Sequence, residues 1–273
     1  MSESFAEKVV LVTGAGRGMG RGIAEAFSER GAKVIVSARS AERGQETVDR
    51  IRAAGGDAFP VMADNADRLA MKQMVEQGVA HYGRLDVVVH CAAHWVQGEI
   101  LDMPEEDFND LLQSNIHALF WLARDVAPHL SKAPDKGRLI FISSGSVNRQ
   151  YLPGNICYSA TKSYMNEFAR GMAMEFGKHN ILVNTVDPGF TATDRLLTMI
   201  SEEVAQALTS TYPIPRPGTA RDVANAVLFM ASDAAAYITG THLLVDGGSS
   251  MSPMPDLDKV LASTRESGAG DRP

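Results

Sequence analysis

The chain has 273 residues, of which 22% are charged, and its formal net charge is -7. An acidic chain without a basic stripe does not match a nucleic-acid-binding surface, so we expect no nucleic-acid partner. Its two cysteines, Cys91 and Cys157, are too few for a disulfide framework and suit a reducing cytosol, so we expect a cytoplasmic location. The N-terminus has no signal-peptide pattern and no run of 18 apolar residues occurs, so we expect no membrane span.

Short β-branched runs alternate with helical patterns along most of the chain. The runs are apolar throughout, which is typical of parallel strands covered by helices on both faces. The chain is long enough for one large domain with a full core. Strands are predicted at 8–13, 32–38, 58–63, 85–92, 137–144, 181–187 and 242–248, and helices at 20–31, 41–56, 67–83, 104–130, 158–177 and 221–231.

This pattern predicts a single α/β domain over residues 1–251. The tail, 252–273, differs in composition because it is rich in Ser, Pro, Gly and Asp. We expect it to be partly ordered or to form an interface.

The first predicted strand runs into the glycine-rich sequence TGAGRGMG at 13–20. Gly14 and Gly18 can adopt positive φ and let backbone approach a phosphate, while Gly20 lets the next helix pack close to the sheet. The N-terminus of that helix offers free N–H groups to a pyrophosphate. The strand–turn–helix context therefore predicts a dinucleotide site.

The end of the second strand indicates which dinucleotide binds. A carboxylate there binds a ribose 2′-hydroxyl, whereas a cation accommodates a 2′-phosphate. Ala38 occupies the place of the acid, Arg39 follows it, and Arg17 lies in the glycine turn. Arg39 could also be an ordinary surface residue, and the only nearby acid, Glu42, fits the first turn of the next helix. We expect NADP (NADPH) rather than NAD.

The sequence YSATK places Tyr158 and Lys162 four residues apart, on one face of a helix. Tyrosine has a free pKa of about 10, which is too high for an acid at neutral pH. The spacing could arise by chance, as one packed aromatic ring and one solvated cation. Alternatively, the ammonium of Lys162 lowers the pKa of Tyr158 and makes it a usable proton donor.

Six motifs in order decide between these interpretations: TGAGRGMG, Asn115 in SNIHALF, ISSGS at 142–146, YSATK, DPGFTATD at 187–194 and ITGTHLLVDGG at 238–248. With them the chain resembles the short-chain dehydrogenase/reductase family over about residues 5 to 250. The resemblance implies a Rossmann-like, doubly wound seven-stranded parallel sheet and a homo-oligomer, a tetramer or a dimer. It also implies hydride transfer between a nicotinamide and a carbonyl or alcohol.

The resemblance further implies a catalytic tetrad of Asn115, Ser144, Tyr158 and Lys162. Tyr158 would supply the proton, Lys162 would also bind the nicotinamide ribose, and Ser144 would hold the substrate oxygen. Asn115 would bend its helix and position water, or would satisfy a buried backbone group. The cofactor residues expected are Gly14, Arg17, Gly18, Met19, Gly20, Arg39, Asp64, Asn65, Ala92, Tyr158, Lys162, Pro188, Gly189, Thr191 and Thr193.

Two departures from the family pattern stand out. His90-Cys91-Ala92-Ala93 replaces the usual Asn-Asn-Ala-Gly after the fourth strand, which puts local cofactor contacts in question. Ser144 lies 14 residues before Tyr158 instead of 13, so Ser143 and Ser146 remain rivals for its role. The scattered histidines lack the pairing of a metal site, and we expect no metal.

The substrate pocket is expected beyond the carboxyl ends of the strands. Its predicted residues are Ser144, Ser146, Tyr151, Tyr158, His94, Trp95 and Phe190. The segment 191–215 has a helical pattern between a Pro-Gly turn and a Pro-rich stretch, which predicts a lid. The apolar side of this lid would consist of Leu196, Leu197, Met199, Ile200 and Val204.

A water-excluding lid favours a neutral ketone or aldehyde with an apolar or aromatic substituent. Two alternatives stay open: reduction of a carrier-bound 3-oxoacyl thioester, and a catalytically silent dinucleotide-binding protein. The helices at 115–130 and 158–177 carry apolar residues that predict a subunit interface. These residues are Phe120, Trp121, Leu122, Tyr164, Met165, Phe168, Met172 and Met174.

Overall fold

The computed structural model describes residues 4–147 and 154–252. Its centre is a seven-stranded sheet in the order β3-β2-β1-β4-β5-β6-β7, in which every neighbouring pair is parallel. This confirms the predicted Rossmann-like, doubly wound α/β fold. The strands are β1 (Val9–Thr13), β2 (Lys33–Ala38), β3 (Asp57–Met62), β4 (Val87–His90), β5 (Gly137–Ile142), β6 (Ile181–Pro188) and β7 (His242–Val245).

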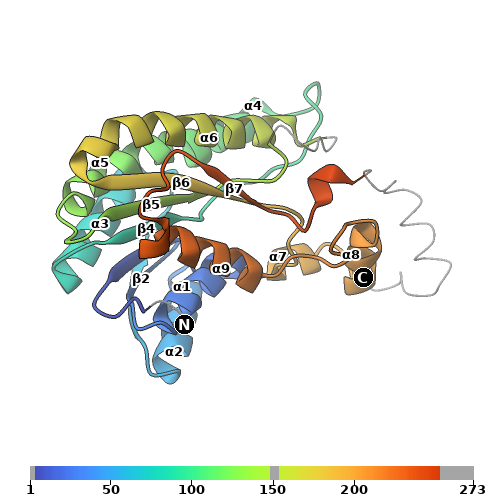
Figure 1. Ribbon diagram of the computed structural model, residues 1–273. Coiled ribbons are helices and arrows are strands. Elements are labelled where there is room, and N and C mark those ends of the chain that lie inside the picture. Colours follow the sequence, from blue (N-terminus) through green and yellow to red (C-terminus); the bar gives the residue numbers. More distant parts are fainter. Residues whose placement is uncertain (1–3, 148–153, 253–273) are drawn as a thin grey trace.

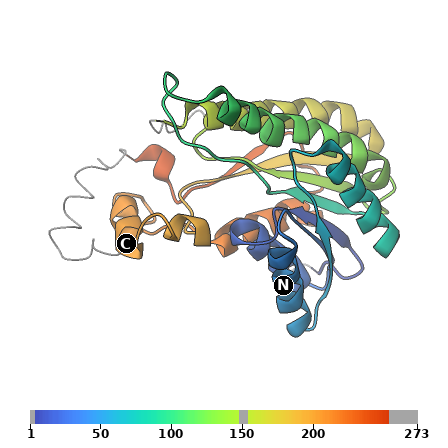
Figure 2. The same ribbon diagram turned by 180° about the vertical axis from the view of Figure 1, so that it is seen from behind.

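Helices cover both faces of the sheet (Figure 1; Figure 2). One face carries α1 (Gly18–Ser28), α2 (Ala41–Ala53) and α9 (Ala220–Ala231). The other carries α3 (Arg68–Tyr82), α5 (Ala118–Leu130) and α6 (Ile156–Phe176). Each face buries its own cluster of apolar side chains, which explains why the central strands are apolar throughout.

The predicted helix at 104–130 is divided in the structure. It consists of α4 (Glu105–Leu112), a π-helical turn at Gln113–His117 and then α5. A π-helical turn holds one residue more than an α-helical turn, and it often marks a functional site. The only predicted catalytic residue on this stretch, Asn115, lies inside the turn.

Short helices follow β6 at the carboxyl edge of the sheet. They are α7 (Asp194–Leu197) and α8 (Glu202–Thr209), and both project from that edge (Figure 1). Of the predicted apolar side of this segment, Val204 is buried, but Leu197 and Met199 are exposed. None of the described helices is long and apolar enough to cross a membrane.

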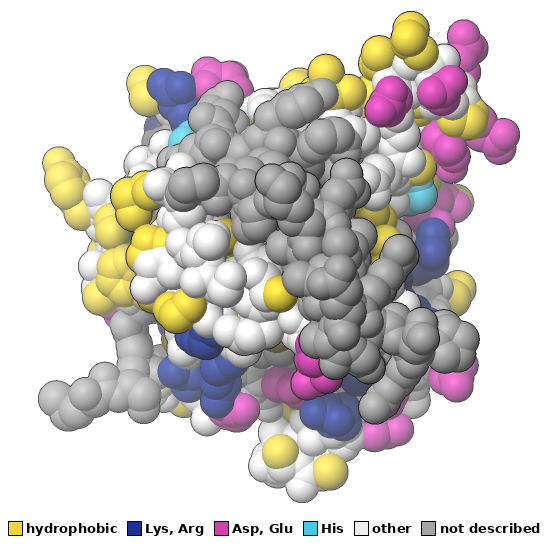
Figure 3. Space-filling model, turned by 90° about the vertical axis from the view of Figure 1, so that its right-hand side faces the viewer, with side chains coloured by type: hydrophobic (Ala, Val, Ile, Leu, Met, Phe, Trp, Pro, Cys, Tyr) yellow, Lys and Arg dark blue, Asp and Glu magenta, His cyan; other side chains and the backbone are white. Residues whose placement is uncertain are grey.

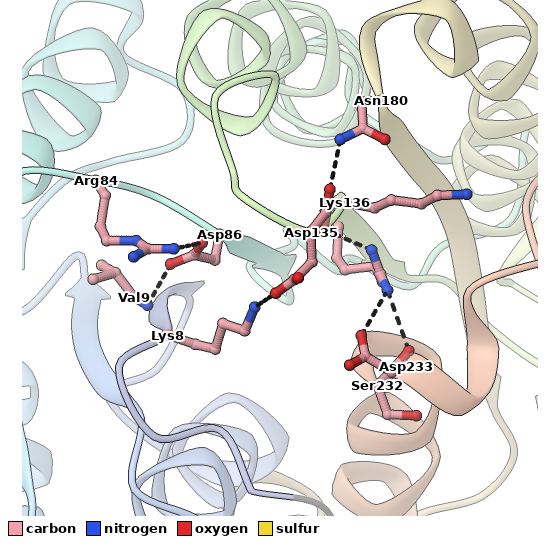
Figure 4. Close-up of polar contacts among 10 residues, drawn as sticks. Lys8, Val9, Arg84, Asp86, Asp135, Lys136, Asn180, Ser232 and Asp233 are labelled. Carbon is pink, nitrogen blue, oxygen red and sulfur yellow. Dashed lines mark hydrogen bonds and ion pairs between the residues drawn. The ribbon is translucent and has the colours of Figure 1, made fainter.

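Polar contacts close the opposite, amino-terminal edge of the sheet (Figure 4). Lys8 pairs with Asp135, and the buried Asp86 accepts hydrogen bonds from the Val9 N–H at 2.9 Å and from Arg84 at 2.5 Å. Arg138 is also buried and donates to the carbonyl oxygen of Lys136 at 2.6 Å. These contacts hold the starts of the strands together. None of them lies at the carboxyl edge, where a ligand is expected to bind.

The helices expected to form a subunit interface contribute less free surface than the sequence predicts. Leu122, Met165 and Met172 belong to the buried core between these helices and the sheet. Trp121 and Phe168 are partly buried against the same core. The exposed members of the predicted set are Phe120, Tyr164 and Met174.

Candidate active site

A cleft lies at the carboxyl ends of the strands and encloses about 390 Å³. This edge of the sheet faces the viewer in Figure 3, where basic side chains lie on the lower half and also near the upper left and right margins, with acidic ones among them. Most of the residues predicted to bind the cofactor line the cleft. They are Gly14, Arg17, Gly18, Met19, Gly20, Arg39, Asp64, Asn65, Ala92, Tyr158 and Thr193.

The glycine turn has the geometry that its sequence predicts. Gly14 and Gly18 have φ values of +66° and +55°, which side chains rarely adopt. A Cβ atom on Gly20 would lie 2.3 Å from the carbonyl oxygen of Gly14, so only glycine lets α1 start this close to the turn. The N-terminus of α1 opens into the cleft, and the turn fits a pyrophosphate.

Three arginines line the cleft near the end of β2. Arg17 comes from the glycine turn, Arg39 directly follows β2, and Arg43 lies in the first turns of α2. Ser40 caps α2 by accepting a hydrogen bond from the Arg43 N–H at 3.3 Å. Sequence reasoning missed Arg43, although its position three residues after a cap residue places it one turn into the helix, beside Arg39.

The unusual segment after β4 is held by Thr13. Its hydroxyl oxygen accepts hydrogen bonds from the backbone N–H groups of Cys91 and Ala92, both at 3.2 Å, and lies 2.9 Å from Nδ1 of His90. Burial, with a contribution from the Lys162 charge, lowers the pKa of His90 to about 3. His90 is therefore neutral, and it supports a backbone that Cys91, Ala92 and Ala93 present to the cleft.

Tyr158 and Lys162 lie on the first two turns of α6. The Nζ atom of Lys162 lies 5.7 Å from the centre of the Tyr158 ring and donates a hydrogen bond to the Ile142 carbonyl at 2.8 Å. Tyr158 lines the cleft, whereas Lys162 is buried beneath it. Burial lowers the pKa of Lys162 to about 8.

The serines after β5 divide into two environments. Ser143 is buried and its hydroxyl donates to the Lys162 carbonyl at 3.3 Å, so it faces the backbone of α6. Ser144 is only partly buried, and its Oγ lies 2.8 Å from the Oγ of Ser146. Ser146 in turn lies 3.3 Å from the Oγ of Ser159, the neighbour of Tyr158. This geometry favours Ser144 over Ser143 as the group that meets a substrate.

Asn115 joins the loop after β4 to α6. Its Oδ1 accepts a hydrogen bond from the His94 N–H at 2.8 Å, and its Nδ2 donates to the His94 carbonyl at 2.9 Å. The same Nδ2 contacts the Thr161 hydroxyl at 3.1 Å, which donates to the Tyr158 carbonyl at 2.8 Å. The buried amide therefore satisfies backbone groups, as one of its two predicted roles requires, and it positions the loop beside Tyr158.

The predicted substrate residues come from several segments. His94 and Trp95 line the cleft, and the Trp95 indole donates to Oδ1 of Asn155 at 2.7 Å. Phe190 is partly buried at the end of β6, while Tyr151 lies outside the described residues. Within the described ranges, no group of three or more His, Cys, Asp or Glu side chains could hold a metal ion.

The remaining cofactor predictions fall on the segment that leaves β6. Pro188, Gly189 and Thr191 do not line the cleft, and the Pro188 carbonyl accepts from the Gly145 N–H at 2.7 Å. Thr193 does line the cleft. Its Cβ atom lies 3.5 Å from the position that a Cβ atom on Gly18 would occupy. The start of the 191–215 segment thus lies against the glycine turn.

Comparisons with known proteins agree with this arrangement. Residues 14–250 match the family model described as enoyl-(acyl carrier protein) reductase. The chain is 37% identical to versicolorin reductase stcU of Emericella nidulans over 88% of this chain and 95% of that protein. It is 36% identical to the 3-oxoacyl-[acyl-carrier-protein] reductase FabG of Escherichia coli over 90% of this chain and 98% of that protein.

Solved structures give the same result. A 7α-hydroxysteroid dehydrogenase complexed with NADH and 7-oxo glycochenodeoxycholic acid is 32% identical, with a TM-score of 0.84 over 90% of this chain and 95% of that one. A short-chain dehydrogenase from Burkholderia cenocepacia in complex with NADP is 32% identical, with a TM-score of 0.83 over 90% and 99%. With its ordered motifs, its fold and these relatives, the chain belongs to the short-chain dehydrogenase/reductase family of oxidoreductases.

Proposed function

We propose that the protein is an NADP(H)-dependent oxidoreductase that interconverts a carbonyl and an alcohol, with Tyr158 as the proton donor in reduction. One observation carries the proposal: a single cleft runs from Arg17, Arg39 and Arg43 to Tyr158, with the buried Lys162 behind the tyrosine. A phosphate-binding end and a proton-donating end in one cleft match the two halves of a nicotinamide-dependent reduction.

The described residues of the cleft fit the adenosine and pyrophosphate parts of a dinucleotide. The glycine turn and the start of α1 would bind the pyrophosphate, and Asp64 and Asn65 would meet the adenine. The three arginines, with Ala38 in place of an acid, would bind a 2′-phosphate through charge-assisted hydrogen bonds. When bound there, the nicotinamide supplies the hydride.

The chain's own residues would complete the reduction. As hydride adds to the carbonyl carbon, negative charge develops on the carbonyl oxygen, and the Ser144 hydroxyl would stabilise it by a hydrogen bond. The O–H bond of Tyr158 then breaks, and its proton passes to that oxygen to form the alcohol. The ammonium of Lys162 would stabilise the phenolate that remains.

The proposed substrate is a neutral ketone or aldehyde with an apolar or aromatic substituent. His94 and Trp95 support this choice, since they bring aromatic rings to the cleft that Tyr158 also lines. Similarity to a 3-oxoacyl-[acyl-carrier-protein] reductase favours a second candidate, a 3-oxoacyl thioester. The two substrate classes differ in charge and length, so one kinetic panel separates them.

The experiment is to follow NADPH absorbance with a panel of aryl and alkyl ketones, anionic keto acids and 3-oxoacyl thioesters. We expect the highest kcat/KM for a neutral ketone or aldehyde. Highest values for the thioesters would establish the second candidate instead. Tight NADPH binding without turnover of any carbonyl would mean a silent dinucleotide-binding protein and would refute the proposed reaction.

Two further properties belong to the proposal. We propose a cytoplasmic location, supported by the free thiols Cys91 and Cys157, which suit a reducing compartment. We also propose a homo-oligomer, a tetramer or a dimer, supported by the apolar side chains of α5 and α6 that remain exposed.

A further inference from the structure

A buried carboxyl group lies beneath α6, on the same side of the sheet as Lys162. Asp187, near the end of β6, is 1% exposed. Its Oδ1 accepts a hydrogen bond from the Thr185 hydroxyl at 2.6 Å, and its Oδ2 accepts one from the Asn166 amide at 3.0 Å. Both partners donate, which is the pattern of an ionised carboxylate.

A third side chain extends this network of hydrogen bonds. The Thr185 hydroxyl lies 3.0 Å from Nδ1 of His242, its neighbour in register on β7. A hydroxyl has one proton, and with Asp187 ionised Thr185 gives that proton to Asp187, which assigns the Nδ1–H tautomer to His242 as the donor to Thr185. The chain of donors therefore points from the sheet edge toward Asp187.

The geometry places this carboxylate at the same part of the sheet as the ammonium of Lys162. Lys162 and Asn166 are four residues apart and share one face of α6, and Asn166 contacts Asp187 directly. The Nζ of Lys162 is bonded to the Ile142 carbonyl, and Ile142 pairs in register with Val186, the residue before Asp187. Lys162 and Asp187 thus lie at the same two neighbouring strand ends, those of β5 and β6.

Four titratable groups interact with Lys162: Tyr158 on α6, whose ring lies near its Nζ, and, through electrostatic interactions, His90 and Cys91 at the end of β4 and Asp187 on β6. Burial lowers the pKa of Lys162 to about 8, while Cys91 and Asp187 act to raise it. Burial also raises the pKa of the Cys91 thiol to about 11, and His90 is neutral, so neither carries a charge near pH 7. Among these four groups, Asp187 supplies the negative charge.

We infer that Asp187 is a positioning residue that keeps Lys162 protonated and so keeps Tyr158 usable as the acid. Neither the motif pattern nor the proposed tetrad assigns it a role. The inference rests on the proposed function, because it acts through Lys162 and Tyr158. It makes a separate claim about Lys162 that does not require turnover.

The first test measures Lys162 directly. Carbon-13 lysine labelling of the protein without cofactor gives an NMR titration for each lysine, and the Lys162 resonance is the one that disappears in Lys162→Met. In Asp187→Asn, which keeps the shape and can still pair with a turned Asn166 amide, we expect the pKa of Lys162 to fall by about one unit. An unchanged Lys162 titration in a folded Asp187→Asn protein would overturn the inference.

The matched control is Asp86→Asn. Asp86 is an equally buried aspartate in the same sheet, but it lies at the amino-terminal edge, bonded to Val9 and Arg84 (Figure 4). Its removal deletes one buried charge far from Lys162, so the Lys162 titration should not move. An equal shift of the Lys162 pKa in both variants would mean that the loss of one negative charge anywhere in the protein causes it. That result would also overturn the inference.

The second test is the pH profile of kcat/KM for NADPH-driven reduction. For a pKa that moves from about 8 to about 7, activity should fall about fivefold at pH 8 and hardly change at pH 6. If Lys162 titrates lower in Asp187→Asn but the kinetic profile stays fixed, Asp187 does keep Lys162 protonated, but the proposed role of Lys162 in the reaction fails and Asp187 is not a positioning residue for Tyr158. Asp187→Ser replaces Asp187→Asn in both tests if thermal melting shows that the latter does not fold.

Discussion

The side chains of Tyr158 and Lys162 can interact because an α-helix brings residues four apart onto one face. The rest of their environment comes from elsewhere in the chain. The β5 strand supplies the carbonyl of Ile142 that holds Lys162, and Asn115 fixes Thr161 beside the Tyr158 backbone. The proposed acidity of Tyr158 therefore depends on the fold around α6, although Tyr158 and Lys162 themselves lie in one pentapeptide.

Replacing Tyr158 by Phe removes the proposed acid and keeps the ring. We expect kcat to fall by a factor of at least about 10² with NADPH affinity nearly unchanged. Steady-state kinetics and a fluorescence titration of NADPH measure the two quantities. Tyr164→Phe is the control, because Tyr164 lies on the same helix but stacks on Phe168 at the surface. Wild-type turnover in the Tyr158 variant would remove Tyr158 from the reaction.

The arginines near β2 predict the choice of nucleotide. We expect the wild type to have the higher kcat/KM with NADPH, and Ala38→Asp combined with Arg39→Gln to move this preference toward NADH by about tenfold to a hundredfold. Arg50→Gln is the control, because Arg50 lies on α2 but pairs with Glu25. Equal values for NADPH and NADH in the wild type would contradict the assignment.

The role of a single residue could be predicted where it depends only on residues nearby in the chain. The glycine turn and the Tyr-Lys pair are local, so the sequence predicts them with their roles. The choice between Ser143 and Ser144 is not local, because it depends on which serine the backbone turns toward α6. Asp187 was missed for the same reason, since its partner Asn166 comes from α6 and its other partner, Thr185, is bonded in turn to His242 on β7.

Among the elements, strands were easier to predict than helix interiors. The predicted strands agree with the observed ones to within three residues at either end, because burial on both faces demands continuous apolar runs. The π-helical turn at Gln113–His117 was not foreseen as such, because its sequence is ordinary for a helix. Within this turn, Asn115 forms hydrogen bonds to the backbone of His94. His94 lies in a loop whose path the sequence does not specify.

The start of α1 gives a test at the scale of elements. In Gly20→Ala, the new methyl group would lie 2.3 Å from the Gly14 carbonyl oxygen, which cannot move without opening the turn. We expect a loss of about 2 kcal/mol or more in unfolding free energy, measured by urea denaturation, and weaker NADPH binding. In Gly177→Ala, the new methyl group would meet no atom within 4 Å apart from the neighbouring backbone, so this variant should stay within about 1 kcal/mol of the wild type. Equal stability of the two variants would mean that the turn is looser than described.

At the scale of the whole molecule, the prediction concerns the oligomeric state. The exposed apolar side chains of the described residues indicate where an interface would form. Phe120, Tyr164 and Met174 remain exposed on α5 and α6. We expect light scattering to give a mass of two or four chains, and Phe120→Glu to reduce it by placing a charge in the interface. Met62→Glu is the control, because Met62 is also exposed but lies on β3 at the far edge of the sheet. A monomeric wild type at micromolar concentration would contradict the proposed oligomer.

The π-helical turn also determines how this chain responds to a change in length. A turn that holds one extra residue can lose one residue and become an ordinary α-helical turn, with the buried faces of α4 and α5 kept in place. Asn115 would then rotate away from His94, and the loop beside Tyr158 would lose its anchor. A single-codon deletion within Gln113–His117 would therefore leave a folded protein without its activity, whereas a deletion within α5 would shift the buried face and unfold it.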